Sequence, residues 1–300
     1  MALVPPSGSK GTLVPLNPNE GDRVPLAPID RTTLGYVAFA LLMTAWRWPE
    51  GLADGRLLLV GLTLVAVCAL VLAPRARQAG SVGPFLAEFY PLVLTVALYS
   101  HVGLVNVTRG VSHDAAVQAW ERVLFGAQPS REWIRSCPCP RWSALMHLAY
   151  LSYYLILAGA PLGLWLSGRR DEARRTLLLM TGTFYVCYAA YLLFPVAGPR
   201  YVFPPAHNAA TAVPIAAFAH RLLESGSAWG TAFPSSHVAV AAVAAVCAWR
   251  AWRPLGAVFL PLAALLGLAT VYGQFHYAVD AFAGIAVAAG VLALGLRVRP

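Results

Sequence analysis

Eight apolar runs separated by polar loops dominate this chain of 300 residues. Most of them have about the length that a tilted helix needs to cross roughly 30 Å of hydrocarbon. They lie approximately at residues 33–46, 57–73, 84–106, 144–167, 175–196, 235–249, 255–273 and 276–296. The pattern predicts an all-α polytopic membrane protein.

The composition favours the same class. Hydrophobic residues make up 58% of the chain and charged residues 12%, against roughly 45–50% and 25% in soluble domains. The formal net charge of +9 raises the question of a nucleic-acid partner, but all basic residues except Lys10 are arginines, alone or in small groups between apolar runs. This placement indicates membrane topology, so we predict no nucleic-acid partner.

The N-terminal third divides into two parts. Residues 1–31 are rich in Pro, Gly and polar residues, without the apolar core of a signal peptide, and predict a flexible tail. Residues 32–83 contain the first two runs and predict an N-terminal pair of membrane helices. The first run is short and is followed by Arg47, Trp48 and Pro49, so residues 33–73 either span twice or form an interfacial or re-entrant pair.

The arginines predict an orientation. With eight spans, both ends of the chain lie on one side, and the loops fall into two sets. One set carries Arg75, Arg77, Arg169, Arg170, Arg174, Arg175, Arg250, Arg253, Arg297 and Arg299, and the other little beyond Arg47 and Arg56. The positive-inside rule makes the first set cytoplasmic and places the long loops 107–143 and 197–234 outside. The Ala- and Arg-rich composition with one Lys is typical of a GC-rich bacterium, so we expect an inner membrane protein with a periplasmic or extracellular site.

Two histidines and an aspartate at the starts of two outer-side helices predict a catalytic centre. His276 and Asp280 are four residues apart, which on a helix brings imidazole and carboxylate within hydrogen-bonding reach. Such a bond fixes the ring tautomer and raises the basicity of the far nitrogen. His237, from another helix start, is a candidate acid for the leaving alcohol.

The same membrane face predicts a phosphate site. Pro234, Ser235 and Ser236 precede His237 where a helix exposes free N–H groups and the positive end of its dipole. Arg200 adds a planar guanidinium that matches phosphate geometry. We predict neither a metal nor a cofactor, because no carboxylate cluster lies on this side.

Structural explanations compete with the catalytic one. A lone histidine near a helix end is usually a satisfied polar residue, and neutralisation of a protonated His276 would by itself account for Asp280. An aspartate within a span nevertheless costs about 2.5–3.5 kcal/mol on insertion scales and is usually kept for a partner or a function. Because Arg200 and the Pro-Ser-Ser-His helix start face the same side, we favour one joint site.

Several other residues have less specific predictions. We expect Glu88 to pair locally or to snorkel, and His147, Tyr150 and Tyr154 either to pack or to line a lipid cleft. In the first outer loop, Trp120, Val123, Leu124 and Phe125 indicate an amphipathic segment at headgroup level as one interpretation. The favoured interpretation is a solvated face, with Glu121 on it. Cys137 and Cys139 lack zinc-spaced partners, which leaves a redox or disulfide role open.

Pro234-Ser-Ser-His237 and His276-x-x-x-Asp280 resemble the second and third signature motifs of the type 2 phosphatidic acid phosphatase superfamily. The resemblance covers approximately Pro84 to the C-terminus and implies a six-helix catalytic membrane domain over residues 84–300. The sequence departs from the phosphatase pattern at two cations: Leu193 stands where the first motif has Lys, and Ala269-Thr270 where the third has Ser-Arg.

Other segments are similar to the inositol phosphorylceramide synthase branch of that superfamily, namely Leu124-Phe-Gly126 with the following Gln128-Pro-Ser, and the tyrosine-rich stretch 147–154. The resemblance implies that His276 attacks phosphorus, Asp280 orients it, and His237 acts first as acid and then as base. Arg200 and the N–H groups around Ser235 and Ser236 would hold the charge on the phosphoryl oxygens.

The implied activity is metal-independent transfer of a phospholipid's phosphoryl headgroup, through a phosphohistidine, to a lipid alcohol, with ceramide and diacylglycerol as candidate acceptors. A lipid phosphate phosphatase that uses water is the alternative within the family. A proton-coupled transporter is the alternative from another class. It predicts duplicated halves with paired broken helices, and the sequence has no internal repeat of this kind.

Overall fold

A computed structural model describes residues 25–48 and 55–297. Residues 1–24 of the predicted tail lie outside these ranges. Helix α1 (Pro28–Arg47) begins before the predicted tail ends. Asp30, in its first turn, is fully buried and accepts hydrogen bonds from the Ala27 N–H at 2.9 Å and from Arg77. A contact with a residue 47 positions away therefore makes this polar stretch helical.

Each of the eight apolar runs is a helix, and the described residues contain no β-strand. Helix α2 (Gly55–Val67) continues through a π-helical turn (Cys68–Leu72) into α3 (Ala73–Arg77). The other long helices are α4 (Gly83–Arg109), α7 (Pro140–Leu166), α8 (Arg170–Leu193), α11 (Ser236–Ala251), α12 (Arg253–Tyr272) and α13 (Ala278–Arg297). Shorter ones are α5 (Asp114–Phe125), α6 (Pro129–Ser136), α9 (Pro199–Val202) and α10 (Pro214–Gly226).

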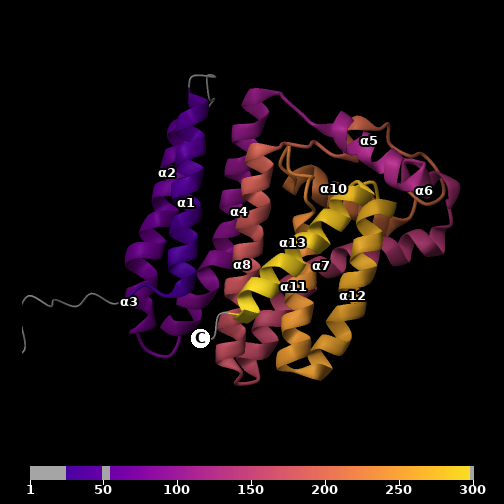
Figure 1. The fold of residues 1–300 in the computed structure, drawn as a ribbon. Helices are drawn as coiled ribbons and strands as arrows, with labels where there is room; N and C mark the ends of the chain where they lie inside the picture. The colour runs from indigo at the N-terminus through magenta and orange to yellow at the C-terminus, as the bar shows by residue number, and fades with distance from the viewer. Residues whose placement is uncertain (1–24, 49–54, 298–300) are drawn as a thin grey trace, which may run out of the picture.

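Six helices of the described chain are long and apolar enough to cross a membrane: α2–α3, α4, α7, α8, α12 and α13. Helix α11 is apolar but has only 16 residues, and α1 is not among the six. These findings confirm the predicted all-α polytopic membrane fold. They also show the N-terminal pair as two long helices side by side at the edge of the bundle, next to α4 and α8 (Figure 1).

Helix α11 lies in the middle of the bundle and packs against α7, α8, α12 and α13. Its inward positions carry alanine and valine, from Val238 to Ala248, and most are fully buried. Small side chains allow several helices to approach one axis. Gly284 of α13 lies so close to the start of α11 that a Cβ there would stand 2.5 Å from the Ser235 carbonyl oxygen. The starts of α11 and α13 are thereby held together.

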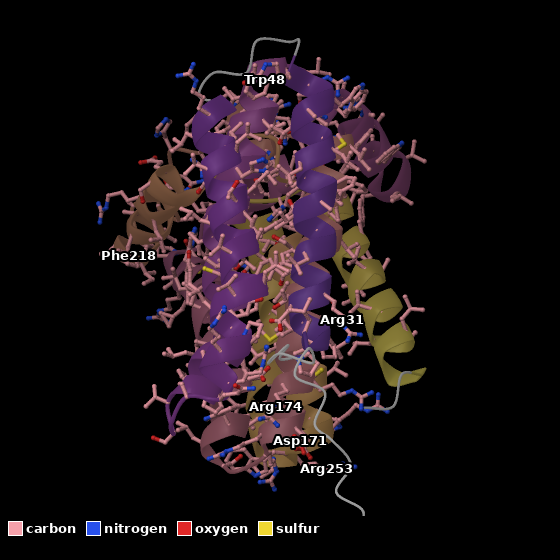
Figure 2. All side chains as sticks on the ribbon, turned by 90° about the vertical axis from the view of Figure 1, so that its left-hand side faces the viewer. Arg31, Trp48, Asp171, Arg174, Phe218 and Arg253 are labelled. Carbon is pink, nitrogen blue, oxygen red and sulfur yellow. The ribbon has the colours of Figure 1, made fainter. Side chains whose placement is uncertain are left out.

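The two ends of the bundle differ. Helices α5, α6 and α10 cover one end (Figure 1). Arg31, Arg174 and Arg253 lie at the opposite end from Trp48 (Figure 2). At the Arg-rich end, Glu88 forms ion pairs with Arg77 at 3.3 Å and with Arg174 at 3.5 Å. Of the two expectations for Glu88, the structure shows pairing. The loops separate into the two predicted sets, and the side that faces the cytoplasm stays a prediction.

Candidate active site

His276 lies in the loop between α12 and α13, with its ring held by a backbone carbonyl. Its Nδ1 is 2.9 Å from the oxygen of Ala232, in the segment that leads into α11. A carbonyl oxygen can only accept, so Nδ1 carries the proton and Nε2 keeps its lone pair. That free nitrogen is the atom a nucleophilic histidine needs, and it points towards His237, 3.5 Å from Nδ1 of that ring.

Asp280 lies beside His276 in an arrangement that differs from the predicted one. Its Oδ2 is 3.4 Å from His276 Nδ1 and accepts a hydrogen bond from the Tyr277 N–H at 2.8 Å. Because α13 begins at Ala278, His276 precedes the helix, and the two residues do not stack on a regular turn. The Ala232 carbonyl is therefore the closer acceptor of the ring proton. Asp280 places a buried carboxyl group next to the ring and holds the start of α13.

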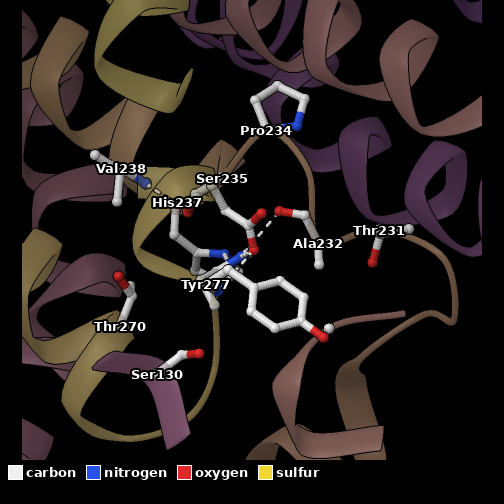
Figure 3. Close-up of polar contacts among 12 residues, drawn as sticks. Ser130, Thr231, Ala232, Pro234, Ser235, His237, Val238, Thr270 and Tyr277 are labelled. Carbon is white, nitrogen blue, oxygen red and sulfur yellow. Dashed lines mark hydrogen bonds and ion pairs between the residues drawn. The ribbon is translucent and has the colours of Figure 1, made fainter. Parts of the chain in front are cut away.

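His237 lies in the first turn of α11, where the Ser235 hydroxyl caps the helix by accepting from the Val238 N–H. Figure 3 shows His237 close to the segment from Thr231 to Ser235. The His237 Nε2 is 3.4 Å from the Tyr150 hydroxyl. If that hydroxyl donates, His237 carries its proton on Nδ1 and donates it to the lone pair of His276. Each ring then has one donor and one acceptor in a single chain of hydrogen bonds.

Burial sets the protonation state of His276. Its side chain is 5% exposed. Loss of solvation lowers its pKa to about 4, and the hydrogen bond to Ala232 opposes this shift only in part. His276 is therefore neutral at pH 7, as a nucleophile must be.

Arg200, on the one-turn helix α9, faces the two histidines across a small cavity. The cavity is lined by Tyr99, Tyr150, Ala197, Arg200, Tyr201, Leu223, Ser227, Ala228, Thr231, Ala232, His237, Phe275 and His276. The guanidinium donates to the Ser227 hydroxyl at 2.8 Å and lies 4.9 Å from the centre of the Tyr201 ring. The volume of about 30 Å³ holds about two water molecules. The structure therefore describes a narrow site, whose walls must move apart to admit a phosphoryl group.

Ser235 and Ser236 are buried and do not line this cavity. The Ser235 N–H donates to the Asp280 carbonyl at 2.9 Å, and the Ser236 N–H to the Tyr191 hydroxyl at 3.1 Å. Their predicted role was to offer free N–H groups to phosphate. In this arrangement those groups have protein partners, and the two serines instead fix the start of α11. Arg200 is left as the cation that faces the histidines.

The tyrosine-rich face of α7 divides between packing and lining. His147 is buried against Tyr272 and Phe275, and Tyr154 is half exposed. Tyr150 lines the cavity.

Two cysteines and an asparagine outside the site also had open roles. Cys137 and Cys139 are both free thiols. Asn106, which begins an Asn-Val-Thr glycosylation pattern, is fully buried, and its side-chain amide donates to the backbone carbonyls of Tyr191 and Gly230.

Two carboxylates near the site were not among the predicted site residues. Asp114 and Glu121, both on α5, are 6% and 0% exposed, although Glu121 was expected on a solvated face. Both accept hydrogen bonds from backbone N–H groups close to predicted site residues: Asp114 from Gly198, near Arg200, and Glu121 from Ala278, near His276. Within residues 25–48 and 55–297, no three His, Cys, Asp or Glu side chains are placed to hold a metal ion.

Two histidines, an aspartate and an arginine around one cavity, at one end of an apolar helix bundle, define a membrane protein with the groups for phosphoryl chemistry. The family model of the PAP2 superfamily matches residues 115–294, more than half of the chain, including His237, His276, Asp280 and Arg200. The chain belongs to the PAP2 superfamily, and this membership supports a lipid enzyme of the phosphatase or phosphotransferase type. Neither the comparison with curated proteins nor the comparison with solved structures gave a match.

Proposed function

We propose that this protein transfers the phosphoryl headgroup of a phospholipid to a lipid alcohol through a phosphohistidine, as an inositol phosphorylceramide synthase does. The observation that carries the proposal is the tautomer of His276. Its Nδ1 proton is bound by the Ala232 carbonyl, and its lone-pair nitrogen faces a second histidine in a cavity that also contains Arg200.

The reaction has two displacement steps. In the first, Nε2 of His276 forms a bond to phosphorus as the bond to the leaving alcohol breaks, and His237 in its protonated form donates a proton to the departing oxygen and becomes neutral. The imidazole then carries positive charge, which the carboxylate of Asp280, 3.4 Å from Nδ1, stabilises. In the second, His237 takes the proton of the acceptor alcohol, whose oxygen attacks phosphorus and releases His276.

The charge of the cavity favours a phosphodiester donor over a lipid phosphate monoester. Arg200 is the one Arg or Lys among the residues that line the cavity in the described part of the chain. A diester carries one negative charge at pH 7, and a monoester about 1.5 to 2. One guanidinium therefore neutralises a diester but leaves a monoester partly uncompensated. Leu193 and Ala269-Thr270, in place of motif cations, agree with this balance.

Product analysis tests the proposal. Purified protein in detergent or vesicles is incubated with a phospholipid donor, alone and with ceramide or diacylglycerol, and the lipids are identified by mass spectrometry. A new phosphorylated lipid that forms only with the acceptor supports transfer. Release of a free phosphorylated headgroup whether or not the acceptor is present would instead make water the acceptor.

We also propose that the site faces the outer side of the membrane. Labelling of Cys139 in intact cells tests this orientation, because Cys139 is exposed at the same end of the bundle as the site.

A further inference from the structure

Helix α5 buries two carboxylates and exposes several large apolar side chains. Val123 and Leu124 are 84% and 65% exposed, whereas Asp114 and Glu121 are almost completely buried. An outward apolar face suits the membrane interface. Buried carboxylates are costly unless they are fully hydrogen-bonded, so their inward position calls for specific partners.

Asp114 has such partners on two separate segments. Its Oδ2 accepts from the Ala197 N–H at 2.8 Å, and its Oδ1 accepts from the Gly198 N–H at 2.8 Å. Oδ1 also accepts from the Tyr277 hydroxyl at 2.8 Å, and the Ser112 hydroxyl donates to Oδ2. One side chain thus bridges the start of the α9 turn and the loop that carries the nucleophile.

The bridged residues are direct neighbours of the catalytic groups. Gly198 has a positive φ of 99°, a conformation that favours glycine, and the chain turns there into the helix that carries Arg200. Tyr277 directly follows His276. Because Asp114 binds the backbone on the Arg200 side and a side chain on the His276 side, it fixes the separation of the cation and the nucleophile.

Glu121, about two turns further along α5, binds Ala278, the residue that follows Tyr277. It accepts from the Ala278 N–H at 2.8 Å and from the Ser130 hydroxyl at 2.9 Å. Ala278 is the first residue of α13. The two carboxylates of α5 therefore contact consecutive residues immediately after His276, and Asp114 alone extends to the Arg200 side.

We infer that Asp114 is a positioning residue that sets the distance between Arg200 and His276 for phosphoryl transfer. This inference rests on the proposed function. A carboxylate is required because both of its oxygens accept. Asparagine would direct an NH₂ group at the N–H of either Ala197 or Gly198 and lose that bond.

Matched substitutions at the two ends of the bundle test the inference. Asp114→Asn should lower kcat/KM about 100-fold, because misplacement of reacting groups by about 1 Å has this effect. Tyr277→Phe, which removes only the hydroxyl, should lower it about tenfold. Asp30→Asn and Tyr185→Phe are the controls, since both alter buried hydrogen bonds at a distance from the site. The controls should lower the melting temperature as much or more and leave kcat/KM per folded molecule unchanged.

A double-mutant cycle separates positioning from general destabilisation. If Asp114 acts by aligning Arg200, Asp114→Asn should have almost no further effect in an Arg200→Ala background. Independent, multiplicative losses would overturn the inference. So would Asp114→Asn and Tyr277→Phe proteins that match their controls in kcat/KM. If Asp114→Asn does not fold, Tyr277→Phe alone provides the decision.

Orthovanadate, which mimics a five-coordinate phosphoryl group, separates failure of the inference from failure of the proposed function. It should raise the melting temperature of the wild-type protein, and Asp114→Asn should bind it at least tenfold more weakly. A wild-type protein that binds vanadate but turns over no lipid tested would refute the proposed function, and the weaker binding would still support the inference. Equal vanadate affinity in both proteins would overturn it.

Discussion

The two ends of the bundle treat buried acids differently. At the Arg-rich end, Asp30 and Glu88 are paired with Arg77, and Glu88 also with Arg174. At the catalytic end, Asp114 and Glu121 bind backbone N–H groups and hydroxyls. Ion pairs neutralise charge at the first end. At the second, acids are satisfied without consuming a cation.

This difference leaves Arg200 available to substrate. In the part of the chain that the structure describes, its guanidinium has no carboxylate within ion-pairing distance, and its nearest polar partner is the neutral Ser227 hydroxyl. A carboxylate beside it would cancel the charge that attracts phosphate. Under the function proposed above, the ion pairs of the Arg-rich end serve stability, and the Arg200 guanidinium of the catalytic end binds the substrate anion.

Removal of the nucleophile should have the largest effect. His276→Ala should abolish turnover, by more than about 10⁴-fold, together with any acid-labile phosphoenzyme trapped from labelled donor. His237→Ala should slow both the formation and the turnover of the intermediate, because proton transfer contributes about 10² to 10⁴-fold. A fully active His276→Ala protein would refute the phosphohistidine.

Arginine removal should separate the two ends. Arg200→Ala should lower kcat/KM about 10² to 10³-fold with little change in melting temperature, and Arg200→Lys should recover only part of the loss. Arg77→Ala should do the reverse, because it leaves Asp30 buried without its ion pair, at about 3–5 kcal/mol of stability, and spares kcat/KM per folded molecule. Equal loss of kcat/KM in Arg200→Ala and Arg77→Ala would refute the claim that only the arginine at the catalytic end serves activity.

The pH profile sharpens the electrostatic contrast. The neutral form of His276 is the reactive one, and burial lowers its pKa to about 4. The acid limb of kcat/KM should therefore lie near pH 4, not near 6.5 where an unperturbed histidine titrates. The free energy of unfolding should also fall at acid pH. In the unfolded chain His276 binds a proton near pH 6.5, whereas in the folded protein it does so only near pH 4, so the contribution of His276 to stability is complete above about pH 6.5 and is lost as the pH falls towards 4. An acid limb near 6.5 would contradict a buried, neutral His276.

The fold was predictable because hydrophobic runs specify membrane helices locally. All eight runs are helices, and the main error was at the start of α1. There Asp30 and Arg31 suggest a polar tail, but Asp30 binds Arg77. Such a contact has no signature in the local sequence, since nothing near Asp30 identifies its partner.

The proximity of His237, His276 and Asp280 was predictable because their motifs begin helices on the same side of the membrane. Their catalytic roles stay predictions. Asp114 and Glu121 were missed because their partners are mostly backbone N–H groups, 83 to 157 residues away, and every residue except proline has such a group. Ser235 and Ser236 begin a helix, so their N–H groups were expected to be free. The groups that bind them, the Tyr191 hydroxyl and the Asp280 carbonyl, come from other helices and cannot be identified from the local sequence.

The smallest effect is expected at Tyr150. Its hydroxyl lies 3.4 Å from His237 Nε2, and donation to that nitrogen keeps the His237 proton on Nδ1, the side that faces His276. Tyr150→Phe should therefore lower kcat about fivefold, the equivalent of one neutral hydrogen bond, and leave KM nearly unchanged. Tyr90→Phe, which removes a hydroxyl from Asp30 at the Arg-rich end, is the control and should affect only stability. If Tyr150→Phe retains the full kcat, the His237 tautomer is set without Tyr150, and the hydrogen-bond chain through the two histidines ends at His237.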